Sequence, residues 1–137
     1  MKKSSLLAFV LLFLLSFMFV GCSFTTAKFV DLETSSAIDA DYMPISPTST
    51  FTPTTPIIYL TGSIESATID SIIQIEWYYI EGGSEEFIAD SLLTVDDINM
   101  YFYFSLSKPT NNWPIGDYEV RIYLDLDLME TVPFSVE

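Results

Sequence analysis

Apolar and polar residues alternate along most of the chain after Phe51, with the period of two that is typical of strands burying one face. No stretch of this region has the period of 3.6 expected of an amphipathic helix. Six or seven short strands at this spacing predict an all-β fold, an antiparallel β-sandwich over residues 51–137. The side chains expected to face its core are Ile58, Leu60, Ile64, Ile73, Ile75, Trp77, Tyr79, Met100, Phe102, Phe104, Leu106, Tyr118, Val120, Ile122, Leu124, Val132, Phe134 and Val136.

Turn-forming residues separate these segments. Glu81-Gly82-Gly83-Ser84 predicts a hairpin, because paired glycines supply the positive φ angles of a tight turn. Lys108 to Asn112 predicts a loop. Pro133 cannot donate a hydrogen bond to a neighbouring strand, so the last strand is expected to lie at a sheet edge or to have its open side there.

The N-terminus has the features of a targeting signal. Lys2 and Lys3 precede residues 6–20, an uncharged and almost wholly apolar stretch that is short for a bilayer span. The sequence Phe19-Val20-Gly21-Cys22 resembles the lipobox of bacterial lipoproteins, although leucine is usual where Phe19 stands. The resemblance implies a signal peptide over residues 1–21, cleavage before Cys22 and lipid attachment to its thiol. The alternative is an uncleaved signal anchor with a free cysteine.

Residues 22–50 differ in character from the segment that follows. Ser, Thr and Pro become frequent toward residue 50, acidic residues are scattered through the stretch, and apolar periodicity is weak. We expect a flexible, solvated tether between Cys22 and the domain. The alternative is that residues 28–32, Lys-Phe-Val-Asp-Leu, pair as an additional strand.

Trp113-Pro114-Ile115-Gly116-Asp117-Tyr118 resembles the tyrosine corner of immunoglobulin-like domains, in which a tyrosine hydroxyl bonds to nearby backbone. The longer run from Phe104 to Val120 is similar to small, uncharacterised prokaryotic lipoproteins with a stand-alone immunoglobulin-like domain. This resemblance implies an immunoglobulin-like β-sandwich of about seven strands over residues 51–137 and brings no catalytic residue. The final hairpin departs from the family, which usually has Asp-Gly where this chain has Asp125-Leu126-Asp127.

The residue composition and net charge exclude several classes of catalytic site and binding partner. The 137 residues include no His and one Cys, which excludes the common catalytic triads and zinc sites. A net charge of −14 makes nucleic acid an unfavourable partner. Removal of residues 1–21 takes away two of the five basic residues and none of the 19 acidic ones. We therefore expect no enzyme, no metal and no cofactor, and a domain that suits a partner with a basic surface.

Two groups of acidic residues offer chemistry. A pair among Glu76, Glu85, Glu86, Asp90, Asp96 and Asp97 would suit glycoside cleavage, which makes a carboxylate-dependent hydrolase of envelope or external glycans the main alternative function. Asp96-Asp97-x-Asn99 and Asp125-x-Asp127 carry oxygen ligands for calcium. The simpler interpretations are a solvated acidic surface and ordinary turn residues.

Four tyrosines lie on the polar parity of their strands and are expected to point outward: Tyr78, Tyr101, Tyr103 and Tyr123. A tyrosine presents a rigid apolar face with a polar tip, which suits protein interfaces and sugar rings. Trp113 is expected to fill a turn in the core rather than to serve as a ligand platform. The function expected is a membrane-anchored, extracytoplasmic binding or accessory module of the cell envelope; a structural spacer or surface coat is a further alternative.

Overall fold

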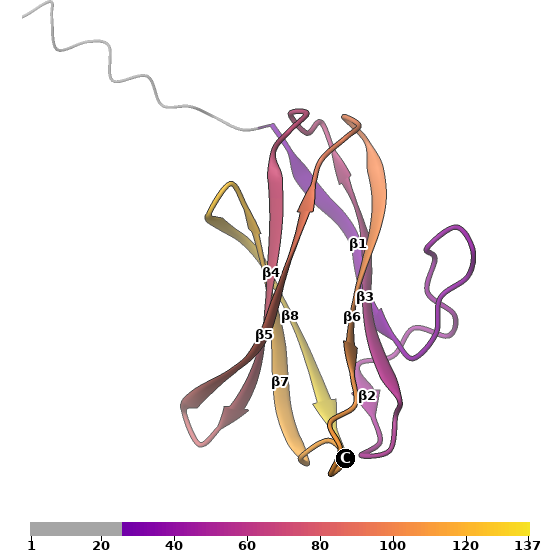
Figure 1. Ribbon diagram of the computed structural model, residues 1–137, viewed down its shortest axis with the longest axis vertical. Helices are drawn as coiled ribbons and strands as arrows, with labels where there is room; N and C mark the ends of the chain where they lie inside the picture. Colours follow the sequence, from indigo (N-terminus) through magenta and orange to yellow (C-terminus); the bar gives the residue numbers. More distant parts are fainter. Residues whose placement is uncertain (1–25) are drawn as a thin grey trace, which may run out of the picture.

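The computed structural model describes residues 26–137, and over that range it contains strands and no helix. The predicted signal peptide and Cys22 lie outside the described residues. The strands are β1 (Lys28–Ser35), β2 (Thr50–Phe51), β3 (Ile57–Glu65), β4 (Ile72–Glu81), β5 (Ser84–Thr94), β6 (Met100–Ser107), β7 (Gly116–Leu124) and β8 (Asp127–Val136). They form a three-stranded sheet of order β1-β3-β6 and a five-stranded sheet of order β2-β8-β7-β4-β5 (Figure 1).

The two sheets form a β-sandwich whose core is built from the alternating apolar residues. Trp77 on β4, Phe102 on β6 and Val120 on β7 are almost completely buried. Edge-to-face contacts join Trp77 to Phe134 at 6.0 Å, and Tyr118 stacks on Phe134 at 5.1 Å. The prediction of an all-β sandwich is confirmed. β5 is the exception to the predicted burial, since none of its residues is buried.

The first strand corrects the expected tether. Residues 28–35 form β1, which pairs antiparallel with β3, so the alternative left open for residues 28–32 is confirmed and the tether assignment is wrong there. Phe29 packs edge-to-face on the buried Phe102 at 5.8 Å, so β1 contributes to the core. β1 approaches β3 so closely that a Cβ on Gly62 would lie 2.7 Å from Cδ2 of Leu32.

The segment after β1 is also tied to the domain. The Thr48 amide donates to the Thr34 carbonyl at 2.9 Å, and the Thr34 hydroxyl donates to the Thr48 carbonyl at 2.6 Å. β2 then pairs parallel with the end of β8. Residues 36–49 are therefore a folded loop rather than an extended linker.

One edge of β8 is open beyond this short pairing. The amides of Ser135 and Glu137 donate to Ser49 and Phe51, so they point toward the β2 side. The period of two places the nitrogen of Pro133 on the same side, where β2 has no further residue to pair with it. Pro133 thus occupies an open edge without a free N–H, as predicted.

Two hairpins use positive φ angles. Gly82 and Gly83, at φ 57° and 84°, form the predicted turn between β4 and β5. Asp125 and Leu126, at φ 47° and 74°, connect β7 to β8 with the same pair of positive angles, which is the pattern of a type I′ turn. The turn lacks the usual Asp-Gly but has the same type I′ backbone, with Leu126 at the position where glycine is usual.

The segment before β7 is fixed by two side-chain hydrogen bonds to backbone. Nε1 of buried Trp113 donates to the Thr55 carbonyl at 2.7 Å, which confirms Trp113 as a core residue. The Tyr118 hydroxyl donates to the Pro114 carbonyl at 2.6 Å. Burial, with contributions from Tyr79 and Glu86, raises the pKa of Tyr118 to about 12.

Candidate functional site on the three-stranded sheet

The four outward tyrosines lie on two different faces. Tyr101 and Tyr103 are on β6, in the three-stranded sheet, whereas Tyr78 on β4 and Tyr123 on β7 belong to the five-stranded sheet. All four point away from the core side of their strands, as predicted, and none is buried. They therefore make two separate surfaces rather than one.

The outer face of the three-stranded sheet carries a cluster of four tyrosines. The Tyr103 ring lies 5.0 Å from the Tyr42 ring and 6.2 Å from the Tyr59 ring, measured between centroids. Tyr101 is 59% exposed and Tyr103 43% exposed. The hydroxyls of all four make no hydrogen bond within residues 26–137, so their polar tips are available to a partner. We call Tyr42, Tyr59, Tyr101 and Tyr103 the tyrosine cluster.

A turn in the loop after β1 places Tyr42 on this face. One carboxylate oxygen of Asp39 accepts from the amides of Asp41 at 2.9 Å and Met43 at 3.0 Å. The Asp39 amide donates to the Met43 carbonyl at 2.9 Å, which closes the turn. Tyr42 takes a positive φ of 65° inside it and reaches Tyr103.

Sequence analysis missed both Tyr42 and Tyr59. Tyr59 shares its parity with the polar Thr61 and Ser63 of β3, and this signal was present in the alternation. Tyr42 falls in the segment assigned to the tether, and its place depends on the Asp39 turn. The one local signal was the density of turn-forming residues around it.

A small hollow adjoins the tyrosine cluster. It has a volume of about 20 Å³, and its lining residues are Asp31, Glu33, Tyr42, Met43, Pro44, Thr61, Gly62 and Tyr101. That volume suffices for a water molecule and excludes a sugar or a nucleotide. The face is thus suited to contact with another surface, with exposed aromatic rings beside the carboxylates of Asp31 and Glu33.

The tyrosines of the five-stranded sheet are engaged within the domain. The Arg121 guanidinium contacts Glu85 and Glu119, each at 2.5 Å, and its Cζ lies 4.1 Å from the centroid of the Tyr78 ring. The hydrogen bonds that the guanidinium donates to these two carboxylates raise the pKa of Arg121. The Tyr78 hydroxyl donates to Glu76 at 2.9 Å. We call Arg121, Tyr78, Glu76, Glu85 and Glu119 the arginine cluster.

The pKa values of the two tyrosines on this sheet follow from the same surroundings. Burial raises the pKa of Tyr78, and the neighbouring Glu76 carboxylate raises it further. Burial and Glu76 also raise the pKa of Tyr123. Tyr78 additionally packs edge-to-face on Phe87 at 5.8 Å. These contacts give the two rings a role in holding the sheet together.

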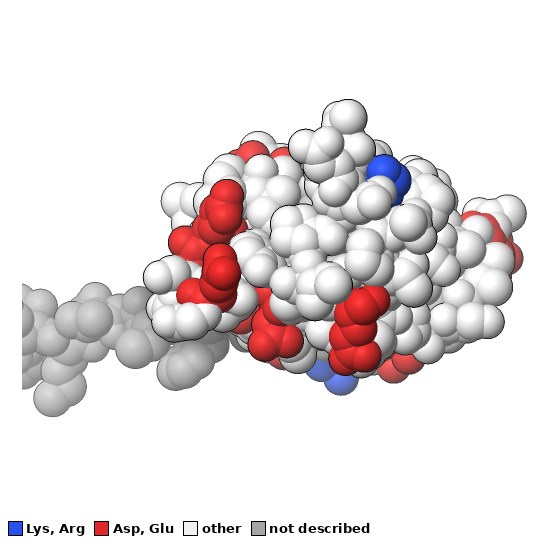
Figure 2. Space-filling view, turned by 90° about the horizontal axis from the view of Figure 1, so that it is seen from below, with Lys and Arg blue, Asp and Glu red and all other residues white. Residues whose placement is uncertain are grey.

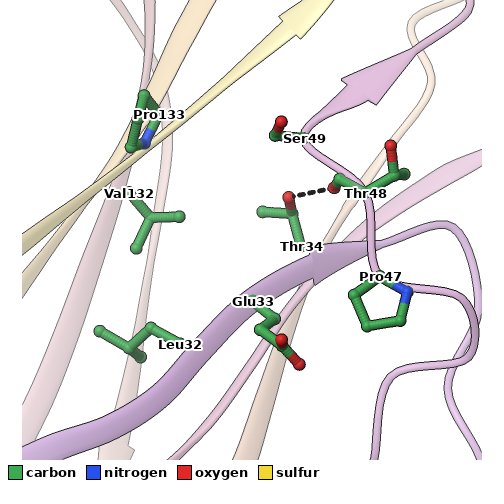
Figure 3. Close-up of a pocket in the computed structure, with 8 residues that line it drawn as sticks. All are labelled: Leu32, Glu33, Thr34, Pro47, Thr48, Ser49, Val132 and Pro133. Atoms are coloured by element: carbon green, nitrogen blue, oxygen red, sulfur yellow. Dashed lines mark hydrogen bonds between the residues drawn. The ribbon is translucent and has the colours of Figure 1, made fainter.

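A larger groove lies where the free edges of β1 and β8 approach each other (Figure 3). Its volume is about 270 Å³, and its lining residues are Leu32, Glu33, Thr34, Pro47, Thr48, Ser49, Val132 and Pro133. The bond between Thr34 and Thr48 satisfies the polar atoms at one end. The charge of Glu33 disfavours pairing of another strand with the free edge of β1. Pro133, which has no N–H, does the same at the free edge of β8.

The side-chain oxygens of Asp97, Asn99 and Asp125 accept hydrogen bonds from backbone amides, within their own turn or in a neighbouring segment. An oxygen of Asp125 accepts from the Ile72 amide at 2.9 Å, Asp97 accepts from the Asn99 amide at 3.3 Å, and Asn99 accepts from the Ser66 amide at 3.1 Å. Within residues 26–137 no group of three or more His, Cys, Asp or Glu side chains is arranged to hold a metal ion.

The carboxylates considered for hydrolysis occupy open positions of the five-stranded sheet and its loops. Glu85 is paired with Arg121, while Glu76 accepts from Tyr78 and is the register partner of Asp90 across β4 and β5. Glu86, Asp90, Asp96 and Asp97 are exposed. These positions identify no acid and base facing each other across a bound substrate.

Comparison with known proteins gives a fold-level likeness. No protein family model matches the chain, and no curated protein matches it. Among solved structures, the chain is similar to the Pseudomonas fluorescens alkylpurine DNA glycosylase AlkC bound to DNA containing an abasic site analog, with a TM-score of 0.50 and 11% sequence identity. The match covers 81% of this chain and 30% of that chain. At this identity the likeness concerns the fold alone.

In the part of the chain that the structure describes, no helix is long and apolar enough to cross a membrane.

Proposed function

We propose that the protein is an extracytoplasmic lipoprotein, held at the membrane by a lipid on Cys22, whose domain is a non-catalytic binding or accessory module of the cell envelope. The lipobox-like Phe19-Val20-Gly21-Cys22 after an apolar segment supports the anchor. Two or more acyl chains would suffice for stable attachment. The tyrosine cluster supports the binding role.

The domain is proposed to be an immunoglobulin-like sandwich. The Tyr118 hydroxyl bond to the Pro114 carbonyl at the start of β7 supports a tyrosine corner. A buried Trp77 on β4, in the middle of the core, fits the same architecture. The β1-β3-β6 and β2-β8-β7-β4-β5 sheets, joined by connections that cross between them, fit it as well.

The observation that carries the binding role is the difference between bonded and unbonded tyrosines. Tyr101 and Tyr103 are exposed and have free hydroxyls within the described residues, whereas Tyr78 is held by Arg121 and Glu76. Asp31 and Glu33 beside the cluster favour a protein partner with a basic surface. DNA, which the glycosylase neighbour binds, is disfavoured here by the net charge of −14.

The test is chemical crosslinking of the full-length, lipidated protein in its own membranes, followed by purification and mass spectrometry. We expect one partner in near-stoichiometric yield, and we expect it to be lost from the double variant Tyr101→Ala/Tyr103→Ala. Tyr123→Ala, on the other face, is the matched control and should retain the partner. Recovery of only neighbouring lipoproteins, unchanged in the double variant, would contradict a binding module and favour a spacer.

The anchor is tested separately by mass spectrometry of the N-terminal peptide from membranes. We expect a lipid-modified Cys22 at the first position. An unmodified Cys22 still attached to Gly21 would overturn the lipoprotein assignment and leave the domain's binding role to be judged by the crosslinking result.

A further inference from the structure

Exposed aliphatic side chains gather at the end of the sandwich where β1 begins. Ile69 in the β3–β4 loop is 53% exposed, Ile98 in the β5–β6 loop 54% and Leu126 at the β7–β8 turn 82%. Ile72, Leu92 and Leu128 extend this apolar surface along the five-stranded sheet. We call this end, made of Lys28, the loops 66–71 and 95–99 and the turn 125–126, the proximal end.

Hydrogen bonds show that these loops share one end. The Ala67 amide donates to the Ile98 carbonyl at 2.9 Å, and the Asp125 amide donates to the Ile72 carbonyl at 3.0 Å. Lys28 forms an ion pair with Glu65, at the last residue of β3, at 3.2 Å. In Figure 1 the start of β1 and the two loops lie together at the top, and the β7–β8 hairpin projects to the left below them.

The opposite end has a different surface. Its β2–β3 and β6–β7 loops carry, among the described residues, a single exposed large aliphatic side chain, Ile115. Figure 2 looks at this end and shows mainly uncharged residues, with acidic side chains toward the margin and few basic ones. Exposed aliphatic side chains also occur in the loop after β1, at Met43 (41%) and Ile45 (49%), so the contrast concerns the loops of these two ends.

The backbone at Leu126 indicates that its side chain is there for a reason other than folding. Its φ of 74° favours glycine or asparagine, and a leucine at such an angle is unfavourable. With 82% of it exposed, the side chain gains little from packing. It borders an open hollow of about 370 Å³, which it shares with Ile72, Gln74, Leu92 and Asp125. Strained residues of this kind are often retained for function.

The chain connects the proximal end to the anchor by a short link. Five residues, 23–27, separate Cys22 from Lys28. At roughly 3.3–3.6 Å per residue, their full extension spans about 20 Å. A lipid on Cys22 would therefore keep the proximal end, rather than the opposite end, next to the bilayer.

We propose that the proximal end rests on the bilayer that carries the anchor, with Ile69, Ile98 and Leu126 in contact with a neutral lipid surface. The proposal depends on the lipid anchor proposed above. Exposed aliphatic side chains gain free energy by leaving water at the headgroup boundary. Acidic residues share this end, namely Asp70, Asp96, Asp97, Asp125 and Asp127, so anionic lipid opposes the contact and zwitterionic lipid permits it.

The experiment uses the lipidated full-length protein in phosphatidylcholine vesicles that contain nitroxide-labelled lipid. A fluorophore is attached through Thr68→Cys at the proximal end or through Thr110→Cys at the opposite end, since lipidation blocks the Cys22 thiol. We expect several-fold stronger quenching of the Thr68 label. Adding phosphatidylglycerol to the vesicles should weaken it, and quenching that strengthens instead would overturn the assignment to neutral lipid.

Variants separate docking from folding. Ile69→Ser, Ile98→Ser and Leu126→Gly together should lower quenching of the Thr68 label several-fold, leaving only the excess over the Thr110 label that the short link to the anchor produces. Ile115→Ser should leave the quenching unchanged. Leu126→Gly alone should weaken quenching without lowering the melting temperature, because glycine suits the backbone there. Vesicle-bound protein whose Thr68 label is quenched equally in the triple variant and in the unsubstituted domain overturns docking and leaves the anchor intact. Protein that fails to bind vesicles, with Cys22 unmodified, overturns both proposals.

Discussion

Both sheets carry tyrosines on their outer faces, but a tyrosine of the five-stranded sheet is bonded to its neighbours whereas two of the three-stranded sheet are exposed. On the five-stranded sheet, Tyr78 is covered by the Arg121 guanidinium and bonded to Glu76. On the three-stranded sheet, Tyr101 and Tyr103 keep exposed rings and unbonded hydroxyls within the described residues. An outward tyrosine is therefore a candidate for binding only when its neighbours leave its ring and hydroxyl free. Substitutions on the five-stranded sheet should therefore lower stability and retain binding, and substitutions in the tyrosine cluster should do the reverse.

The largest stability effect is expected from the arginine cluster. Arg121→Met keeps much of the aliphatic stem but leaves Glu76, Glu85 and Glu119 near one another without a counter-charge. Charge-assisted hydrogen bonds and the stacking on Tyr78 are lost, and we expect the free energy of unfolding to fall by about 1–2 kcal/mol. Urea denaturation measures it. Lys108→Met is the control, and partner binding should be retained; loss of the partner without loss of stability would reverse the assignment of the two faces.

Tyr118 differs from both groups of outward tyrosines, because it is buried between the two sheets. Tyr118→Phe removes the bond to the Pro114 carbonyl and should cost about 1 kcal/mol at pH 7. The folded-state pKa of Tyr118, about 12, exceeds the unfolded value near 10, so the unfolded state loses its proton first as the pH rises. Its contribution is complete below pH 10 and is lost toward pH 12.

Urea denaturation at several pH values between 8 and 12 tests this dependence. The stability of the unsubstituted protein should fall more steeply above pH 10 than that of Tyr118→Phe. Parallel curves for the two proteins would show that Tyr118 ionises equally easily in the folded and unfolded states.

The tyrosine cluster should show little effect on stability and a large effect on binding. Tyr101→Ala/Tyr103→Ala removes the ring contacts with Tyr42 and Tyr59, and we expect a loss of about 1 kcal/mol or less. Thermal unfolding measures this loss, and crosslinking in membranes measures binding. Tyr101→Phe/Tyr103→Phe then separates the contribution of the hydroxyls from that of the rings. A large drop in melting temperature would make the cluster structural, like its counterpart on the other sheet.

The smallest effect is expected from the exposed ion pair on the three-stranded sheet. Lys28 and Glu65 lie 3.2 Å apart with side chains 66% and 44% exposed. Lys28→Gln should change the free energy of unfolding by less than about 0.5 kcal/mol. Urea denaturation alongside Arg121→Met makes the comparison direct. Equal losses in the two variants would mean that burial and multiple partners add nothing to the arginine cluster.

Most strands after residue 51 could be predicted because one parity of each is apolar; β5, whose apolar residues fall on both parities, is the exception. β1 could be predicted only as an alternative, since Asp31, at φ 53°, lies in an irregularity that shifts the register between Val30 and Glu33 and breaks the alternation. The outward direction of Tyr78, Tyr101, Tyr103 and Tyr123 followed from parity. Their division between two faces depends on which strands pair, and parity within a strand carries no information about its neighbours.

The site was only partly predictable for a related reason. Tyr101 and Tyr103 were identified, while Tyr42 is brought to them by the Asp39 turn across a gap in sequence. The arginine cluster likewise joins Glu85 on β5 to Arg121 on β7 through β4, which lies between them. Contacts between residues so far apart in sequence form only when the strands pair, so local sequence patterns do not predict them.

The pairing of β1 with β3 also has a mechanical consequence. The described chain begins at the proximal end, and β1 runs from there along the length of the sandwich (Figure 1). The hydrogen bonds of an antiparallel pair are perpendicular to the strands, so a pull on residue 26 along the long axis loads the β1–β3 bonds in shear, many at once. Shear loading resists detachment better than peeling one bond at a time. A domain held by its N-terminus and pulled by a bound partner would thus transmit tension through its first strand while the core stays intact.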